Sequence, residues 1–417
     1  MPTATRSLAL VLSLAVGTLV VSPASAQTMS PVPDPTPVIT PADQAAFEQW
    51  VKVFARTAKE VGISAEAVDT NLTGLTLSER VVRANESQPE FTRSVWDYLN
   101  GVVREERITQ GQSLLTQHQA ILADVERKYG VQGRYIMAIW AIETNFGSIL
   151  GSHNVFEALA TLGYRGRRTA YGRSQLLAAL KLADRGDMPA TGMVGSWAGA
   201  MGQTQFIPTT YLDYAVDGDG DGARDLWTSL PDVFHSTAAY LERSGWQRGR
   251  DWGREVAIGP DFDFDLVGRT TYLPLNEWAA RGVTGPGGDP LPQVDVPARM
   301  VIPAGHRGPA FLVFRNFDSI LRYNASTSYA LAVGHLADRI AGGFEIQQAW
   351  PTDLRPLSRS ERKELQERLN TRGFGAGKVD GIIGANTRKA IKGFQKQAGL
   401  VADGYPSSEL LQALRTQ

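Results

Sequence analysis

Apolar residues recur every three to four positions from residue 41 to about residue 245, and this periodicity constrains the fold more than any other feature of the sequence. Such spacing is typical of amphipathic helices, and Gly and Asn residues divide it into separate segments. The first helix is expected to begin at Pro41, with Thr40 as its N-cap. We therefore predict a mainly helical body.

The pattern changes between residues 252 and 315, where prolines and glycines are dense. Two short apolar runs, at residues 299–303 and 310–314, are typical of strands. Helical periodicity returns at residues 326–341. The predicted fold class is therefore mainly α with short strands, an α+β architecture.

The first 26 residues have the layout of a secretory signal peptide. Arg6 is their only charge, an apolar run covers residues 8–21, and Ala24-Ser-Ala follows. The run is short for a membrane span, and the alternative is an uncleaved anchor. Residues 27–41 carry five prolines and are expected to form a flexible leader. The mature chain is thus predicted to be a soluble, exported protein.

Composition excludes several kinds of chemistry. The chain has no cysteine, which rules out disulfides, thiol nucleophiles, cysteine-bound zinc and a lipid anchor on cysteine. Its five histidines are scattered, so a histidine-rich metal site is not expected. With 42 basic and 43 acidic residues, the net charge of −1 argues against nucleic acid as a partner.

The last part of the chain, residues 357–417, forms a separate block after a linker at residues 346–356. The block carries a net charge of +5, whereas the rest of the expected mature chain carries −7. A basic module on an acidic body suggests an anionic polymer as its ligand, and the alternative is an ordinary solvated helix face. Asp380-Gly and Asp403-Gly each precede a helical segment, which makes a weak internal repeat. We predict a small three-helix unit.

Glu143 follows an uncharged segment of eight residues. On a helix it shares a face with Ile136, Ile139, Trp140 and residues 146–147. Burial among apolar side chains disfavours the ionised form, so we expect a raised pKa. A carboxyl group that stays partly protonated near neutral pH can act as a general acid. The alternative is an ordinary glutamate at a helix end, satisfied by the adjacent threonine or by a backbone group.

A second segment, residues 195–208, has no charge but contains small residues, aromatic rings and amides. Small residues allow a backbone to approach a ligand closely. Trp197 and Phe206 offer stacking faces, and Gln203 and Gln205 offer hydrogen bonds, a combination that suits sugar rings. The alternative is a tight crossing of two helices, which also needs small residues.

A third segment, Asp217-Gly-Asp-Gly-Asp-Gly, fills positions 1, 3, 5 and 6 of an EF-hand loop. Position 12 is Thr228, so the usual bidentate glutamate is missing, and an acid four residues later is the candidate closing ligand. We favour Ca2+ in a structural role, with no cofactor for the chemistry; the alternative is an acidic surface turn. The candidate ligands are Asp217, Asp219, Asp221, Ala223, Asp225 and Asp232.

Over residues 42–345 the chain resembles the membrane-bound lytic murein transglycosylase B family. The resemblance rests on Glu143-Thr-Asn-Phe-Gly, Ala158-Leu-Ala-Thr-Leu, the 195–208 segment, the aspartate-rich loop and Arg322-Tyr-Asn, in this order. It implies a lysozyme-like helical catalytic domain with a smaller inserted lobe. It also implies cleavage of the β-1,4 bond between N-acetylmuramic acid and N-acetylglucosamine without water, which leaves a 1,6-anhydromuramoyl end.

The resemblance assigns a role to each matching residue. Glu143 is the expected acid, and because no second acid shares its uncharged setting, we expect it to act next as the base. Other positions match residues that hold the acetamido groups, a basic pair facing the peptide stem, and groove-lining residues. Ser196 and Gln205 match the residues that hold the acetamido groups, and Arg167 and Arg168 match the basic pair. Tyr240, Tyr323 and Asn324 match the groove-lining residues.

Residues 357–417 resemble the peptidoglycan-binding domain of bacterial cell-wall enzymes. The expected partners are therefore peptidoglycan glycan strands in the periplasm, with cell-wall synthesis complexes as further candidates and no membrane span. The resemblance rests on Leu365, Gly373, Asp380-Gly381, Gly384, Thr387, Ala390-Ile391 and Phe394-Gln395.

Three other functions are compatible with parts of the sequence. A hydrolytic muramidase would use the same acid but leave reducing ends. A non-catalytic peptidoglycan-binding scaffold would keep the fold without activity. A calcium-dependent adhesin would need several aspartate-rich repeats, and the sequence contains one.

Overall fold

The structure is a computed structural model that describes residues 38–86, 93–186 and 192–416. The predicted signal peptide and most of the predicted leader lie outside the described residues. Helix α1 (Pro41–Glu60) begins at the predicted position, and a capping box forms there. The Asp43 N–H donates to the Thr40 hydroxyl, and the Thr40 N–H donates to the Asp43 carboxylate. The cap thus fixes the start of the helix.

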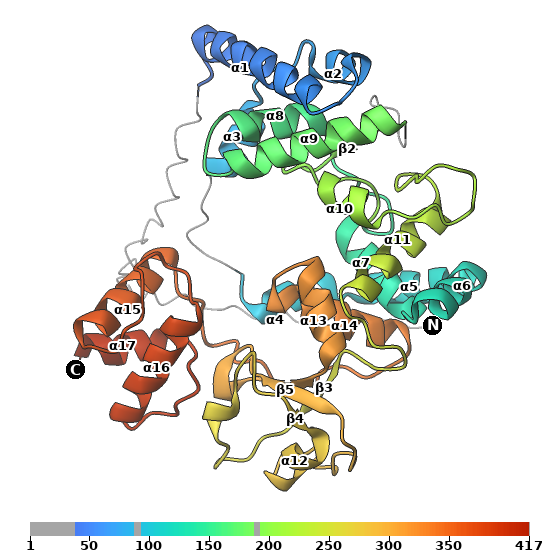
Figure 1. The fold of residues 1–417 in the computed structure, drawn as a ribbon. Helices are drawn as coiled ribbons and strands as arrows, with labels where there is room; N and C mark the ends of the chain where they lie inside the picture. Colours follow the sequence, from blue (N-terminus) through green and yellow to red (C-terminus); the bar gives the residue numbers. More distant parts are fainter. Residues whose placement is uncertain (1–37, 87–92, 187–191, 417) are drawn as a thin grey trace, which may run out of the picture. The chain divides into compact units, whose positions relative to one another are not determined.

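One group of helices packs around an apolar core that includes Phe47, Phe156 and Tyr211. Figure 1 shows α8 and α9 running alongside each other in this group. They can approach closely because Gly172 has no side chain. A Cβ there would lie 2.3 Å from the backbone nitrogen of Gly163. The members are α1, α2 (Ala65–Leu72), α3 (Glu79–Glu86), α8 (Val155–Tyr164), α9 (Thr169–Arg185) and α10 (Pro208–Tyr214).

A second group of helices surrounds α7 (Gly133–Thr144), in which nine of twelve residues are buried. A helix that is apolar on all sides is stable only inside a core, which explains this central place. The mainly helical prediction is confirmed. The other members are α4 (Val95–Val102), α5 (Glu105–Gln117), α6 (Gln119–Tyr129), α11 (Leu230–Arg243), α13 (Arg315–Tyr323) and α14 (Thr327–Ile340).

The two predicted strands belong to a four-stranded antiparallel sheet with the order β3-β6-β5-β4. The lobe around this sheet has its own apolar core, in which the fully buried Trp278 of α12 (Leu275–Ala280) is the largest side chain. The smaller inserted lobe is therefore confirmed. The strands are β3 (Gly253–Val256), β4 (Leu273–Pro274), β5 (Pro297–Val301) and β6 (Ala310–Val313); β1 (His153–Asn154) and β2 (Val194–Gly195) pair separately.

The C-terminal block contains the three predicted helices, α15 (Arg359–Thr371), α16 (Ala385–Gln397) and α17 (Ser408–Thr416), around a core of its own. Both Asp-Gly turns have the same geometry. The carboxylate of Asp380 accepts the N–H two residues on, that of Asp403 does the same, and each following glycine has a positive φ. The internal repeat in the sequence is therefore a repeated turn before a helix.

The segment predicted as a linker, residues 346–356, is packed against its surroundings. The N–H groups of Gln347 and Gln348 both donate to the Glu255 carboxylate at 2.8 Å. Trp350 lies against Trp96, with ring centroids 6.2 Å apart. These contacts attach the segment to the sheet of the inserted lobe and to α4.

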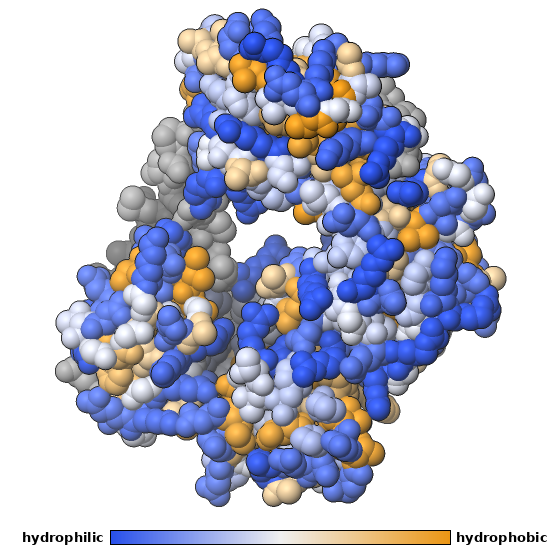
Figure 2. Space-filling model, viewed as in Figure 1, coloured by the Kyte–Doolittle hydropathy of each residue, from blue (hydrophilic) through white to orange (hydrophobic). Residues whose placement is uncertain are grey.

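Apolar side chains on the face shown in Figure 2 form small groups scattered among hydrophilic ones. Among the described helices, none is both long and apolar enough to cross a bilayer.

Candidate active site

Glu143 lies in the last turn of α7, and the chain turns sharply just after it. Asn145 and Phe146 have φ values of 49° and 57°, a region that non-glycine residues rarely adopt. The Thr144 hydroxyl accepts the Gly147 N–H at 3.0 Å and so fixes this turn. Phe146 and Gly147 therefore follow the helix rather than sharing a helical face with Glu143, which corrects that detail of the prediction.

The environment of Glu143 keeps it partly protonated near neutral pH. Burial raises its pKa to about 7, and a hydrogen bond from the Tyr329 hydroxyl opposes this rise. The hydroxyl donates to Oε1 over 2.5 Å. The raised pKa expected from the apolar segment is therefore found, and its cause is the expected desolvation.

Tyrosine rings surround this carboxyl group. The pKa of Tyr98, Tyr323 and Tyr329 is raised first by burial and then by the charge of Glu143. The rings of Tyr323 and Tyr329 are nearly parallel at 8°, and Tyr240 packs edge-on against Tyr323. Tyr98 and Tyr329 were not predicted as site residues; the signal in the sequence was a lone tyrosine in each of two predicted helical segments.

The uncharged segment at residues 195–208 forms a tight turn beside the end of α7. The Ser196 hydroxyl accepts the N–H groups of Ala198 and Ala200. Gln205 has a φ of 52°, and its side-chain amide donates to the Leu150 carbonyl at 3.3 Å. A Cβ on Gly151 would lie 2.1 Å from the Gly195 carbonyl oxygen, so the two segments are in backbone contact.

Two residues that the sequence offered for sugar contacts are structural instead. Gln203 is 7% exposed, accepts the Trp140 indole N–H, and donates to the Trp227 carbonyl. Phe206 is 2% exposed, within the first helical core. Both predictions were wrong because tertiary contacts bury the side chains. Trp197 keeps partial exposure.

The predicted basic pair and groove residues lie in three settings. Arg167 donates to the Asn85 carbonyl at 2.9 Å, while Arg168 lies over the Trp197 ring. The Tyr240 hydroxyl donates to the Arg322 carbonyl, and the Tyr323 hydroxyl to that of Thr204, at 2.6 Å each. Asn324 directly follows α13. Of these residues, Tyr323 lies close to Glu143, and Tyr240 packs against Tyr323.

In the aspartate-rich loop, Asp217, Asp219 and Asp221 each place one carboxylate oxygen within 4.8 Å of the others. This spacing fits a hard cation such as Ca2+. Asp225 and Asp232 also brace the loop by hydrogen bonds. Asp225 accepts backbone N–H groups two and three residues on, and the oxygens of Asp232 accept those of Gly218 and Asp225 at 2.6 Å.

Asp232 and Ala223 were also expected at the metal, and both stay predicted ligands. Asp232 closes the loop by hydrogen bonds and is not part of the carboxylate cluster. Ala223 contributes its N–H to Asp221, and its carbonyl remains the predicted ligand.

Comparison with known proteins agrees with this geometry. A family model described as the transglycosylase SLT domain matches residues 46–338, and one described as a putative peptidoglycan binding domain matches residues 358–414. Membrane-bound lytic murein transglycosylase B of Escherichia coli (strain K12) is 32% identical over 256 residues, which cover 61% of this chain and 69% of that protein.

Solved structures extend the likeness to both parts of the chain. SltB3 from Pseudomonas aeruginosa, in complex with NAG-anhNAM-pentapeptide, is 53% identical with a TM-score of 0.87, over 89% of this chain and 99% of that one. Soluble lytic transglycosylase SltB1 from Pseudomonas aeruginosa is 29% identical with a TM-score of 0.62, over 70% and 98%. This chain therefore belongs to the lytic murein transglycosylase B family and carries a C-terminal peptidoglycan-binding domain.

Proposed function

We propose that this transglycosylase cleaves the β-1,4 bond between N-acetylmuramic acid and N-acetylglucosamine, with Glu143 as its only acid and base. The observation that carries the proposal is the placement of Glu143 at the end of α7, where its carboxyl group accepts a hydrogen bond from Tyr329. Burial raises its pKa to about 7, which suits a group that donates and then accepts a proton. The complex of SltB3 with an anhydromuramoyl ligand supports the non-hydrolytic product.

The reaction needs one proton to move twice. Glu143 donates its proton to the leaving glycosidic oxygen while the bond to C1 breaks. The substrate's own N-acetyl carbonyl stabilises the cationic C1. Glu143, now a carboxylate, takes the proton of the C6 hydroxyl as O6 bonds to C1, which restores the acid and consumes no water.

The contacts of Glu143 suit this sequence. Among the described residues, the hydrogen bond from Tyr329 reaches Oε1, and none reaches Oε2. Tyr329 therefore orients the carboxyl group, and Oε2 is left for the substrate. The next acid along the chain, Glu157, accepts the backbone N–H and hydroxyl of Thr76 and is occupied elsewhere. Most glycosidases use two carboxylates. Because no second carboxylate is available beside Glu143 among the described residues, we infer a single-acid mechanism.

The remaining substrate contacts are proposed on the same basis. Ser196 and Gln205, held by the tight turn, would contact the acetamido groups, and Arg167 and Arg168 the acidic peptide stem. Tyr240, Tyr323 and Asn324 would line the glycan groove. We also propose export to the periplasm through residues 1–26 and attachment to the wall by the C-terminal module; participation in cell-wall synthesis complexes stays a prediction.

Product analysis tests the reaction type. Purified protein incubated with sacculi is expected to release muropeptides one water lighter than those of a muramidase, as measured by mass spectrometry. Hydrated products with reducing ends would replace the proposal with a hydrolytic muramidase. No release at all would favour a non-catalytic scaffold.

Replacing Tyr329 by phenylalanine should move the pH profile upward. The Tyr329 hydrogen bond lowers the pKa of Glu143, so its loss raises that pKa. The alkaline limb of kcat/KM, which reports loss of the acidic proton, should shift to higher pH. We expect kcat to fall less than in a variant of the acid itself. Tyr129→Phe is the matched control, and an unchanged limb in Tyr329→Phe would contradict the orienting role.

We propose that Asp217, Asp219 and Asp221 hold a structural Ca2+, helped by the Asp225 side chain and the Ala223 carbonyl. The fit rests on three carboxylates close enough to repel one another without a cation. The Escherichia coli lytic transglycosylase Slt35 was solved in complex with calcium, which supports the choice of metal. The ion would brace the loop before α11 and take no part in proton transfer.

Calcium is expected to raise the melting temperature. At a hundredfold excess over its Kd, a ligand that binds only the folded state adds about 2.7 kcal/mol to the free energy of unfolding. Calorimetric titration with Ca2+ should give one site, and Asp219→Asn should weaken it at least tenfold. Asp213→Asn is the control. Equal melting temperatures with Ca2+ and with a chelator would exclude the site.

A further inference from the structure

Helix α4 buries side chains on two of its sides. One side, which includes Tyr98 and Leu99, packs into the core around α7. Positions 96 and 98 point to opposite sides of the helix, because they are about 200° apart around its axis. Trp96 is nevertheless only 5% exposed, so a second set of neighbours covers it.

The neighbours of Trp96 come from later parts of the chain. Ala304 belongs to the turn between β5 and β6, and Leu354 belongs to the 346–356 segment. Tyr405 of the C-terminal domain packs against the same small apolar cluster. The cluster therefore joins α4 to the inserted lobe, to the 346–356 segment and to the C-terminal domain.

The C-terminal domain docks on the turn between β5 and β6 through polar groups. The His306 backbone N–H donates to the Asp403 carboxylate at 2.9 Å, and the ring Nδ1 of His306 lies 2.7 Å from the same oxygen. Arg307 pairs with Glu409 at 3.0 Å. A Cβ on Gly305 would lie 2.6 Å from the Asp403 carboxylate. The two surfaces therefore fit closely, with no room for a further side chain.

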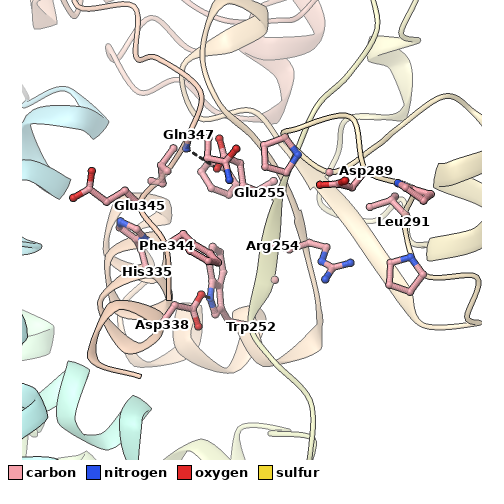
Figure 3. Close-up of a pocket in the computed structure, with 17 residues that line it drawn as sticks. Trp252, Arg254, Glu255, Asp289, Leu291, His335, Asp338, Phe344, Glu345 and Gln347 are labelled. Carbon is pink, nitrogen blue, oxygen red and sulfur yellow. Dashed lines mark hydrogen bonds between the residues drawn. The ribbon is translucent and has the colours of Figure 1, made fainter. Parts of the chain in front are cut away.

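The 346–356 segment is fixed beside the same cluster. The Gln347 N–H donates to the Glu255 carboxylate of β3 at 2.8 Å (Figure 3). Three residues later, the Trp350 ring lies against that of Trp96, with centroids 6.2 Å apart. The indole of Trp96 is thus held by groups that are themselves anchored.

The other side of α4 faces the proposed acid. This helix packs against α14, which carries Tyr329, and the Tyr329 hydroxyl donates to Glu143 at 2.5 Å. Burial and then the charge of Glu143 raise the pKa of Tyr98, so the Tyr98 ring lies close to the carboxyl group. A movement of α4 would therefore displace Tyr98 and admit water to Glu143.

We propose that Trp96 is a positioning residue through which the docked C-terminal domain supports the active site. The domain and the 346–356 segment hold Trp96, Trp96 fixes α4, and α4 keeps the Tyr98 ring close to Glu143. The domain thereby raises turnover even on substrate too short to reach it. The effect rests on the proposed function, in which Glu143 is the acid.

The test measures turnover of a soluble tetrasaccharide of alternating N-acetylglucosamine and N-acetylmuramic acid by the full-length protein. Trp96→Ala should lower kcat about tenfold with little change in KM, and Trp96→Phe should restore most of the loss. His306→Ala combined with Arg307→Ala should act like Trp96→Ala, because this double variant loosens the docking and leaves α4 unchanged. Water at Glu143 should lower its pKa, so the alkaline limb of kcat/KM should move to lower pH in both.

A second measurement does not depend on turnover. Hydrogen exchange of residues 95–102, followed by mass spectrometry, should be faster in the double variant than in wild type. Arg281→Ala is the matched control, since Arg281 forms an exposed ion pair with Glu277 elsewhere on the inserted lobe. Its kinetics and its exchange should equal those of wild type.

Equal kcat and equal exchange in wild type and in the double variant would overturn the proposal. So would an effect on KM alone, since the domain would then only bind substrate. A lower kcat without a shift of the alkaline limb would also overturn it, because that result indicates loss of folded protein. Full turnover by Glu143→Gln would instead refute the proposed function, and faster exchange of α4 in the double variant would still show the coupling.

Discussion

Replacing Glu143 by glutamine is expected to reduce the release of anhydromuropeptides by about 10²–10⁴-fold, the usual contribution of general acid–base catalysis. Glutamine keeps the size of the side chain but can neither give the proton to the glycosidic oxygen nor take one from the C6 hydroxyl. Affinity for glycan should change little, because the substrate contacts lie on other residues. Rates on sacculi and binding to soluble glycan fragments measure the two effects.

Glu157→Gln is the matched control, since its carboxylate contacts Thr76 and not the active site. Its turnover should equal that of wild type. Substantial turnover by Glu143→Gln would remove Glu143 from the mechanism, and a parallel loss of glycan binding would point to a structural role.

The same variant should gain stability at alkaline pH. The folded-state pKa of Glu143, about 7, lies above the ordinary value of 4.5. Wild type therefore loses stability as pH rises from 4.5 through 7, by on the order of 3 kcal/mol for such a shift. Glutamine has no proton to lose. The two proteins should unfold alike below pH 4 and differ above pH 7, as urea titrations can show.

A second large effect is expected at Gly151, where alanine should cost about 3 kcal/mol of stability and most of the activity. The residue has a φ of +99°, which costs an alanine about 1–2 kcal/mol. Its new Cβ would lie 2.1 Å from the Gly195 carbonyl oxygen. Overpacking of this kind adds typically 1–3 kcal/mol, and here backbone must move. The displaced turn carries Ser196, so turnover should fall as well.

Gly62→Ala separates the two contributions. Gly62 has a similar φ of +91° but nothing within 4 Å of its Cβ position. This variant should lose only the backbone term and keep full turnover. If Gly62→Ala and Gly151→Ala were equally stable in urea, close packing between residues 151 and 195 would not matter.

Much of the fold was predictable because local signals agree with tertiary structure. The Thr40 cap places the start of α1 at Pro41, as predicted, and the structure shows a second capping box, at Ser358, at the start of α15. The strands at residues 299–303 and 310–314 were found from composition, although β5 begins and ends two residues earlier than expected. Capping and periodicity are encoded within a few neighbouring residues, so they can be read without a structure.

The site was predictable only in part. Glu143 stood out because an uncharged segment precedes it. Tyr329 did not, because it is 186 residues away along the chain and meets the acid only through helix packing. Gln203 and Phe206 were misjudged for the same reason, since their burial depends on distant partners. Composition identified a segment suited to binding sugars but not which of its side chains are available to a ligand.

The packed segment at residues 346–356 limits how far the C-terminal domain can move from the catalytic body. Eleven free residues could span up to about 40 Å and would let a bound module roam. Anchored at Glu255 and Trp96, the segment allows little of that reach. We therefore expect the distance between the C-terminal domain and Glu143 to vary little. We expect cuts in the glycan strand to fall at a regular distance from the point where the C-terminal domain binds the wall.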